Sequence, residues 1–448
     1  MLGAQIPLIS ALPFVALLLA IAILPLVAPH WWHANRNKAL VATAVSLPVL
    51  IQFLIGLGAP GRVVLGEKTH EYVGFIVVIG ALFVITGGIH IRGSLSGTPL
   101  LNTGVLGVGA VLANLLGTTG ASVLLIRPLL RANKHRRRTT HIVVFFIFLV
   151  ANCGGLLTPI GDPPLLLGFL KGVPFEWTLR LWPQWLAVTA ILLVVFNLWD
   201  QSVFDREERE RAGSLLDRVM VHAPLRVQGR AAIAALGGVL VTIVLAGRAA
   251  AQGTPWATGT QEAIIVALAA TEYFATPHDN RKENTFTFGP IIEVAVLFAG
   301  IFVTMAPVLE ILNAWSQGTR TILGMTFGVS QPWQFFWTTG ALSSVLDNAP
   351  TYLAFAASAA GLQGVPAHGA YVGALALHPE GARLLAALAT GSVFMGANTY
   401  IGNAPNFMVK AIAEENGIKM PSFFGYMAYS CGILLPIFVL ITLVFFRH

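Results

Sequence analysis

Apolar runs of membrane-spanning length, separated by short polar segments, are the main pattern along this chain. The first three runs cover residues 6–28, 39–57 and 72–91, and comparable runs recur until the last one, at residues 423–446. A helix of about 20 apolar residues crosses the hydrocarbon core of a bilayer. The pattern therefore predicts an all-α protein that crosses a membrane many times.

Two of the apolar segments are interrupted in their middle. Residues 100–130 contain five glycines around Asn114, Thr118 and Thr119, and we interpret this segment as a re-entrant hairpin with its tip near Gly117. One long, glycine-rich spanning helix is the alternative. Residues 333–361 predict a second hairpin, with its tip at the stretch Asp347-Asn348-Ala-Pro-Thr351.

Two other segments contain a motif that no helix can pass through intact. The motif reads Thr158-Pro-Ile-Gly-Asp162-Pro-Pro in the first copy and Thr399-Tyr-Ile-Gly-Asn403-Ala-Pro in the second. Proline removes a backbone donor, and glycine permits dihedral angles that other residues resist. We expect broken helices at residues 139–171 and 383–413.

The order hairpin, then broken helix, occurs twice, which predicts two structural repeats. The first repeat would cover residues 1–199 and the second residues 231–448, joined by a charged cytoplasmic linker at residues 200–230. Each repeat would contribute five crossings, and an odd number inverts the second repeat relative to the first. Interrupted segments at matching positions of two halves indicate the binding site of a secondary transporter. Two unrelated proline kinks, which membrane helices tolerate, are the alternative.

Composition and charge fit a membrane protein. Only 10% of the residues are charged, where a soluble protein has about a quarter. The net charge of +7 comes from Lys and Arg in loops, as the positive-inside rule describes, so we expect a lipid bilayer and no nucleic acid as partner. The most basic loop, residues 127–138, should be cytoplasmic, which puts both termini outside. Cys153 and Cys431 lie in apolar runs and predict no disulfide.

Polar side chains at the interruptions are the candidate ligands of a transported ion. Free carbonyl, hydroxyl and amide oxygens are hard donors that suit Na⁺. The neutral candidates are Asn114, Thr118, Thr119, Asn152, Thr158, Asn348, Thr351, Asn398, Thr399 and Asn403.

Asp162 and Asp347 would add the negative charge. A carboxylate at membrane depth costs at least about 2.5–3.5 kcal/mol, so it normally faces a cavity or a partner. Because such a group can take either H⁺ or Na⁺ but not both, it is sufficient for antiport. For Asp162 a helix cap and an ion ligand are equally good interpretations, whereas the ligand is favoured for Asp347. Glu293 is a candidate proton relay, with a snorkelling interfacial residue as the alternative.

Several classes of function have no motif here. The sequence contains no GxGxxG, Walker loop, HExxH or CxxC, so it predicts neither an ATP-driven pump nor a metalloenzyme. We expect no enzyme and no cofactor, only transported Na⁺ and H⁺. A pair of aspartates at membrane depth also occurs in intramembrane proteases, which remain a rival class.

The same motifs resemble the ion transporter superfamily over nearly the whole chain. Within it, Thr-Pro-Ile-Gly-Asp162, Leu-Asp347-Asn348-Ala-Pro-Thr351 and residues 396–406 are similar to bacterial NhaD-type sodium:proton antiporters and to citrate-transporter-like proteins. The resemblance implies a scaffold domain, a moving transport domain with both hairpins, a homodimer, and a bacterial inner membrane.

One departure from that superfamily bears on the substrate. Its dicarboxylate and citrate symporters carry Ser-Asn-Thr at both hairpin tips, where this chain has Gly117-Thr118-Thr119 and Asp347-Asn348-Ala349. We therefore expect an elevator-type antiporter that exchanges Na⁺ (or Li⁺) for H⁺. A Na⁺-coupled citrate or dicarboxylate symporter and an arsenite-type efflux carrier are the alternatives.

Overall fold

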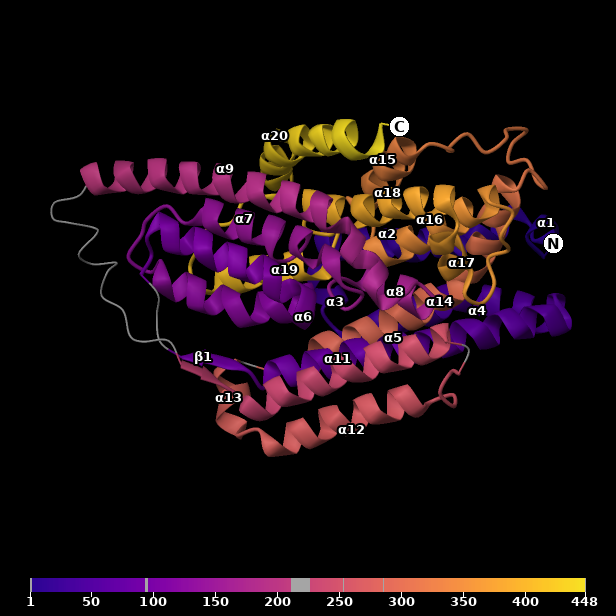
Figure 1. Ribbon diagram of the computed structural model, residues 1–448, viewed down its shortest axis with the longest axis horizontal. Coiled ribbons are helices and arrows are strands. Elements are labelled where there is room, and N and C mark those ends of the chain that lie inside the picture. The colour runs from indigo at the N-terminus through magenta and orange to yellow at the C-terminus, as the bar shows by residue number, and fades with distance from the viewer. Residues whose placement is uncertain (1, 93–95, 211–225, 253, 285, 448) are drawn as a thin grey trace.

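The computed structural model describes residues 2–92, 96–210, 226–252, 254–284 and 286–447, and they fold almost entirely into helices (Figure 1). Nine helices in this part of the chain are long and apolar enough to cross a membrane. The prediction of an all-α, multi-pass membrane protein is confirmed. Besides the helices there are two short strands, β1 (His90–Arg92) and β2 (Arg226–Gln228), which pair antiparallel.

The chain begins with helices that lead to the long helix α5. They are α1 (Leu2–Gln5), η1 (Leu8–Ala11), α2 (Leu12–Val27), α3 (Pro29–Trp32), α4 (Asn35–Ile51), the π-helical turn η2 (Gln52–Gly56) and α5 (Gly58–Gly87). The interrupted segments follow as α6 (Pro99–Ala132), α7 (Thr140–Leu149), η3 (Cys153–Leu157), α8 (Pro163–Leu170), η4 (Phe175–Leu181) and α9 (Trp182–Arg209).

The second half has a similar order of elements. It starts with α11 (Arg230–Ala251), α12 (Thr260–Ala275), α13 (His278–Glu283) and α14 (Gly289–Ser316). In Figure 1, α11 and α12 run beneath α5 along the lower edge. The chain then forms α15 (Pro332–Ser343), α16 (Asn348–Leu362), α17 (Tyr371–Leu377), α18 (Pro379–Met395), η5 (Gly396–Asn398), α19 (Ala404–Glu415), α20 (Phe423–Ile441) and the π-helical turn η6 (Thr442–Phe446).

Helix α6 is a hairpin whose two halves lie against each other. The backbone leaves helical geometry at Gly117, with φ 74° and ψ 156°. The side-chain amides of Asn102 and Asn133, at opposite ends of α6, exchange two hydrogen bonds of 3.0 and 2.8 Å. A Cβ on Gly109 would lie 3.0 Å from the side chain of Leu125. Since both pairs are centred on residue 117, the chain reverses its direction there.

Two segments expected as polar linkers are instead helical. Residues 58–71 form the start of α5, and two of their charges are paired inside the protein: Lys68 donates to Glu71 at 3.1 Å, and Lys171 pairs with the same carboxylate. Likewise, α9 continues to Arg209, and the carboxylate of Asp200 is buried 2.6 Å from Arg136. The rest of the expected linker at 200–230 includes residues 211–225, which lie outside the described residues.

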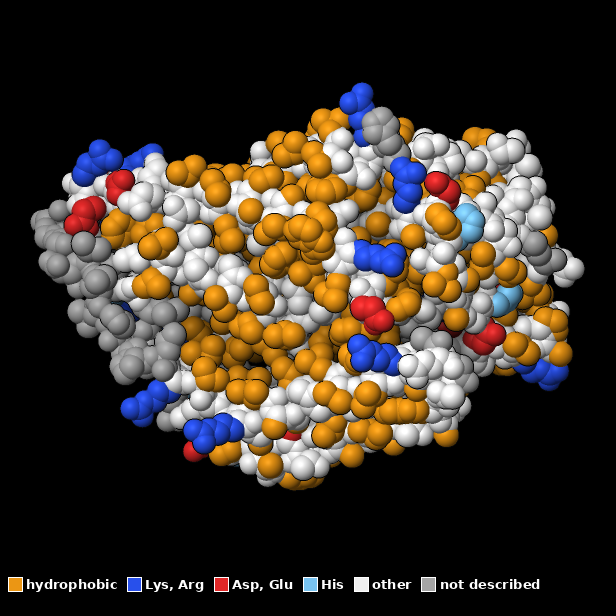
Figure 2. Space-filling view, in the orientation of Figure 1, with side chains coloured by type: hydrophobic (Ala, Val, Ile, Leu, Met, Phe, Trp, Pro, Cys, Tyr) orange, Lys and Arg blue, Asp and Glu red, His pale blue; other side chains and the backbone are white. Residues whose placement is uncertain are grey.

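The surface is apolar over wide areas. Figure 2 shows hydrophobic side chains across the middle of one face, with charged side chains scattered among them and near the ends. Leu100, Leu198 and Phe274 are among the large apolar side chains that are more than two-thirds exposed. Contiguous apolar surface of this kind is covered by another apolar phase. In a protein with nine candidate spans, that phase is the hydrocarbon core of a bilayer.

Candidate functional site

The two breaks adopt closely similar backbone conformations. In the first, Thr158 and Asp162 are both extended, with φ/ψ of −135°/153° and −147°/146°. In the second, Thr399 and Asn403 repeat these values at −137°/168° and −153°/139°. A proline within the first two positions of α8 and α19 restarts each helix after the break, where its missing N–H costs nothing. The motif residues thus produce the same local structure twice.

The carboxylate of Asp162 is the centre of the site. Its side chain is buried and accepts three hydrogen bonds: 2.8 Å from the Thr118 hydroxyl, 2.6 Å from the Asn348 amide and 3.1 Å from the Asn403 amide. These donors come from the first hairpin tip, the second hairpin tip and the second break. All four interrupted segments therefore meet at one carboxylate.

A chain of asparagines continues the network from Asn403 into the protein. The Asn403 amide also donates to the Asn152 side chain at 3.2 Å, and Asn152 donates to Asn406 at 2.6 Å. Asn406 in turn donates to the backbone oxygens of Gly396 and Thr399, at 2.8 and 2.9 Å. These bonds satisfy carbonyls that the broken α18 leaves without helical partners. The hydrogen bonds of Asn152 with Asn403 and Asn406 hold the two breaks against each other.

Each break is fixed to the hairpin tip of its own half by a threonine. The Thr158 hydroxyl donates to the backbone oxygen of Asn114 at 2.5 Å, and the Asn114 side chain accepts the backbone N–H of Leu157 at 2.8 Å. In the second half, Thr399 donates to the backbone oxygen of Ser344 at 2.5 Å. Asn114 is a residue of α6 and Ser344 is the C-cap of α15, so both threonines bind a hairpin close to its turn.

The two aspartates have different local roles. Asp162 makes no side-chain capping bond to α8. Asp347 is the N-cap of α16, because its carboxylate accepts the Ala349 N–H at 3.1 Å, and its backbone oxygen accepts the Thr351 hydroxyl at 2.9 Å. The capping interaction that the sequence suggested for Asp162 is therefore found at Asp347.

Two buried amide oxygens in this region have no hydrogen-bond partner among the described residues. They belong to Asn348 and Asn398. The Asn348 amide nitrogen donates to Asp162, and the Asn398 nitrogen donates to the Ser344 hydroxyl at 2.9 Å. An unpaired buried acceptor costs about 1–3 kcal/mol, unless a cation or a water satisfies it. Amide oxygens beside a carboxylate are ligands of the type that Na⁺ prefers.

A cavity of about 50 Å³ borders Asp162. It is lined by the first hairpin tip, including Thr118 and Thr119, by residues 160–163 of the break, and by Leu82 and Phe83 of α5. Asp162 contributes the only charge among the lining residues. One water needs about 10–15 Å³ of such space, so the cavity has room for a few waters or one small cation.

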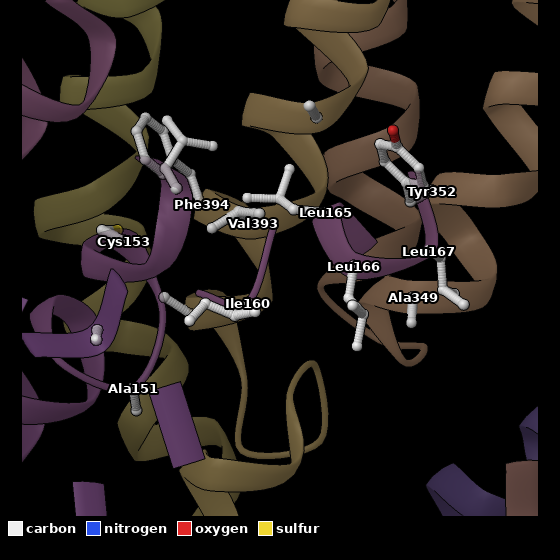
Figure 3. Close-up of a cluster of buried hydrophobic side chains, with 14 of the residues drawn as sticks. Ala151, Cys153, Ile160, Leu165, Leu166, Leu167, Ala349, Tyr352, Val393 and Phe394 are labelled. Carbon is white, nitrogen blue, oxygen red and sulfur yellow. The ribbon is translucent and has the colours of Figure 1, made fainter. Parts of the chain in front are cut away.

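An apolar layer surrounds the polar centre. Figure 3 shows side chains from the first break, α8, α16 and α18 packed together, among them Ile160, Leu166, Tyr352 and Phe394. The helix α7 that leads to the break is buried over nearly its full length. This packing surrounds Asp162 with apolar side chains, and Ile160 and Leu166 also line the cavity beside it. In a site of low dielectric constant, the interactions of the carboxylate with a proton or cation are strengthened.

One sequence candidate lies elsewhere, and two contributors were not anticipated. Glu293 near the start of α14 forms a 2.7 Å ion pair with Lys38 and has no contact with the Asp162 network in the described structure. Ser344 and Asn406 had not been proposed. Asn406 has the apolar Leu165 as its counterpart in the first motif, so comparing the two copies gives no signal for it.

Fold and site together define a class of protein. A multi-pass membrane protein in which two broken helices and two hairpin tips meet at a buried carboxylate has the architecture of a secondary transporter. The chain belongs to the family described as "Putative citrate transport", whose model matches residues 3–446. This membership confirms the resemblance to citrate-transporter-like members of the ion transporter superfamily. A comparison with curated proteins found no match.

Proposed function

We propose that this transporter exchanges Na⁺ (or Li⁺) for H⁺, with Asp162 as the group that binds one or the other. The observation that carries the proposal is the environment of its carboxylate: it is buried, it accepts hydrogen bonds from Thr118, Asn348 and Asn403, and it borders a cavity. The charge of a buried carboxylate must be neutralised by a proton or by a cation. Those two ligands compete for the same oxygens.

The size and charge of the cavity support a cation over a carboxylate substrate. Citrate carries several negative charges, and Asp162 is the only charged residue in the lining of about 50 Å³. Two like charges about 4 Å apart repel each other by ~4 kcal/mol at an effective dielectric constant of 20. A carboxylate substrate would lie beside that negative charge, and the described lining has no cationic side chain to offset it.

The proposed exchange needs only a few steps at this site. With Na⁺ bound, the charged Asp162 and the unpaired oxygen of Asn348 would be ligands, with the hydroxyl of Thr118 nearby. When a proton replaces Na⁺, the carboxyl is neutral and still accepts hydrogen bonds from the surrounding amides. Both loaded forms are electrically neutralised at the carboxylate, whereas the empty, charged form is not. Only the loaded forms would move easily through a low-dielectric environment.

Two inverted repeats and an elevator-type movement are part of the proposal. The matching dihedral angles of the two breaks and the two threonine–hairpin hydrogen bonds support the repeats. The hairpins and breaks would form the moving domain, whereas α5 and α14 would belong to the scaffold. By the positive-inside rule we assign the basic loop to the cytoplasm and both termini to the outside of a bacterial inner membrane. A homodimer is also proposed, from the superfamily resemblance.

Citrate or dicarboxylate transport coupled to Na⁺ is the second candidate, because the family description names citrate. Purified protein in liposomes distinguishes the two. An outward Na⁺ gradient should drive proton entry, measured with a trapped pH indicator, and no uptake of radiolabelled citrate should occur with or without Na⁺. Citrate uptake that needs Na⁺, without proton counterflow, would replace the antiport proposal with the symport one.

A further inference from the structure

A second, larger cavity lies apart from the Asp162 site. Its volume is about 230 Å³, and it shares no lining residue with the cavity beside Asp162. It is formed by η4 and by residues near the starts of α9, α15 and α18, together with η6. Because these five elements come from distant parts of the sequence, apart from the adjacent η4 and α9, an occupant would connect them.

The charged residues that line this cavity are two arginines, Arg180 and Arg383. Arg180 is exposed. Arg383 is half-exposed and lies 3.5 Å from Glu380, which is not a lining residue. Pro332, near the start of α15, also lines the cavity. The N-terminal end of α15 carries partial positive charge, which adds to the arginines, although the N–H of its third residue is already capped by Gln331. The cavity therefore attracts an anion.

Two buried polar atoms in the wall support a ligand. Trp177 lines the cavity and is 6% exposed, and its indole Nε1–H has no hydrogen-bond acceptor among the described residues. The side-chain oxygen of the lining residue Gln184 is likewise without a partner there. An unsatisfied polar group in a buried wall costs about 1–3 kcal/mol. An occupant with an acceptor oxygen for Trp177 and a hydroxyl donor for Gln184 would remove that cost.

The rest of the lining is apolar, and the surroundings are those of a membrane interface. Leu181 and Phe446 are buried in the wall. Next to it, Trp182 and Trp333 are 57% and 44% exposed on the surface. Exposed tryptophans concentrate where hydrocarbon meets lipid headgroups.

We propose that this cavity binds the phosphodiester headgroup of an anionic phospholipid. Arg180 and Arg383 would hold the phosphate oxygens from two sides, since guanidinium groups match the geometry of phosphate. Trp177 would donate to an ester or glycerol oxygen, and an acyl chain would follow the apolar wall past Phe446. A small hydrophilic anion would also neutralise the two arginines, but it would leave the apolar wall of the cavity exposed to water. The bound lipid would connect η4 and the start of α9 to the helices α15 and α18.

The test measures lipid affinity on the purified, full-length protein. Phosphatidylglycerol and phosphatidylcholine are titrated in detergent, with bound lipid counted by native mass spectrometry. The wild type should bind phosphatidylglycerol at least tenfold more tightly than phosphatidylcholine. The variant Arg180→Gln/Arg383→Gln should lose that preference, and Arg180→Lys/Arg383→Lys should retain part of it. The matched control Arg62→Gln/Arg248→Gln removes two exposed arginines that do not line the cavity and should bind as the wild type does.

Three results would overturn the proposal. One is equal affinity for the two lipids in the wild type. Another is an unchanged preference in the Gln double variant, provided that it elutes as the wild type does on size exclusion. The last is displacement of phosphatidylglycerol by equimolar inorganic phosphate or citrate, which would make this a site for a soluble anion. None of these results depends on whether the protein exchanges Na⁺ for H⁺.

Discussion

The amide of Asn403 donates a 3.1 Å hydrogen bond to the carboxylate of Asp162, although 241 residues separate the two. That separation equals the offset between the two copies of the motif, so the residues that contact each other are equivalent positions of the two copies. Direct contact between equivalent positions is expected where an approximate two-fold axis passes through a structure. One copy supplies the charge at this point and the other supplies a neutral donor.

Replacing Asp162 with Asn should abolish exchange without unfolding the protein. The amide has the same shape but no charge, and rotation of the Asn348 side chain can present an oxygen to it. We expect Na⁺-driven proton movement in liposomes to fall to the level of empty liposomes, with an unfolding temperature no lower than that of the wild type. Asp205→Asn is the control, because that carboxylate is exposed on α9 and accepts a hydrogen bond from Gln201. Wild-type exchange by Asp162→Asn would remove Asp162 from the mechanism.

Two substitutions of Asp347 separate its role as the N-cap of α16 from the effect of its negative charge on Na⁺ binding. Asp347→Asn retains a good N-cap for α16, whereas Asp347→Ala loses it at a cost of about 0.5–2 kcal/mol. We expect the Asn variant to unfold like the wild type and to exchange ions with weakened Na⁺ affinity. The Ala variant should show both a lower unfolding temperature and a weakened Na⁺ affinity. Thermal unfolding and the Na⁺ dependence of proton flux measure the two effects independently, and equal unfolding temperatures for both variants would contradict the cap.

Gly117 should be intolerant of a side chain. Its dihedral angles, φ 74° and ψ 156°, lie in a region that is essentially open to glycine alone, and other residues there cost about 1–3 kcal/mol. An added Cβ would also lie 3.2 Å from the backbone oxygen of Ile160, beside the Asp162 cavity. Gly117→Ala should therefore lower both stability and exchange. Gly104→Ala in the same hairpin meets no atom within 4 Å and should have neither effect.

The pair formed by Glu71 and Lys171 gives a prediction about buried charge. Lys68 and Lys171 both bind Glu71, and all three side chains are nearly buried. Glu71→Gln leaves two buried cations without their carboxylate, so we expect a loss of about 3–5 kcal/mol. Lys171→Met should cost less, because Lys68 still neutralises Glu71. The exposed pair of Arg138 and Glu210 is the comparison: Glu210→Gln should cost no more than about 1 kcal/mol. Chemical denaturation in detergent ranks the three variants.

Much of the architecture could be predicted because local chemistry determines it. Single prolines such as Pro25 and Pro307 lie inside helices, but a cluster of glycine and proline stops a helix. The positions of both breaks therefore follow from a few adjacent residues, and the glycines of α6 indicate the turn at Gly117. The hydroxyl and amide side chains near these interruptions also come from short motifs. Thr118, Asn348 and Asn403, which bind Asp162, were all among the predicted residues.

What the sequence did not predict depends on pairing across long distances. Residues 58–71 are polar enough for a loop, yet they form a helix, and Glu71 at the end of this stretch pairs with Lys171, 100 positions further on. Glu293, in the second half of the chain, similarly pairs with Lys38, which lies near the N-terminus. Ion pairs between residues so far apart in the sequence cannot be inferred from hydrophobic periodicity or composition. The cap formed by Asp347, and its absence at Asp162, have the same origin, since they depend on which donors each carboxylate meets.

The most direct test of the central claim is the pH dependence of Na⁺ binding. If Na⁺ and H⁺ compete for the carboxylate of Asp162, calorimetry on the purified protein should give an apparent Kd for Na⁺ that rises as the pH falls. The increase should approach tenfold per pH unit, which is the limit for one competing proton, and Asp162→Asn should lose the high-affinity binding. A Kd for Na⁺ that stays constant across the acid range, or one that Asp162→Asn leaves unchanged, would contradict the account.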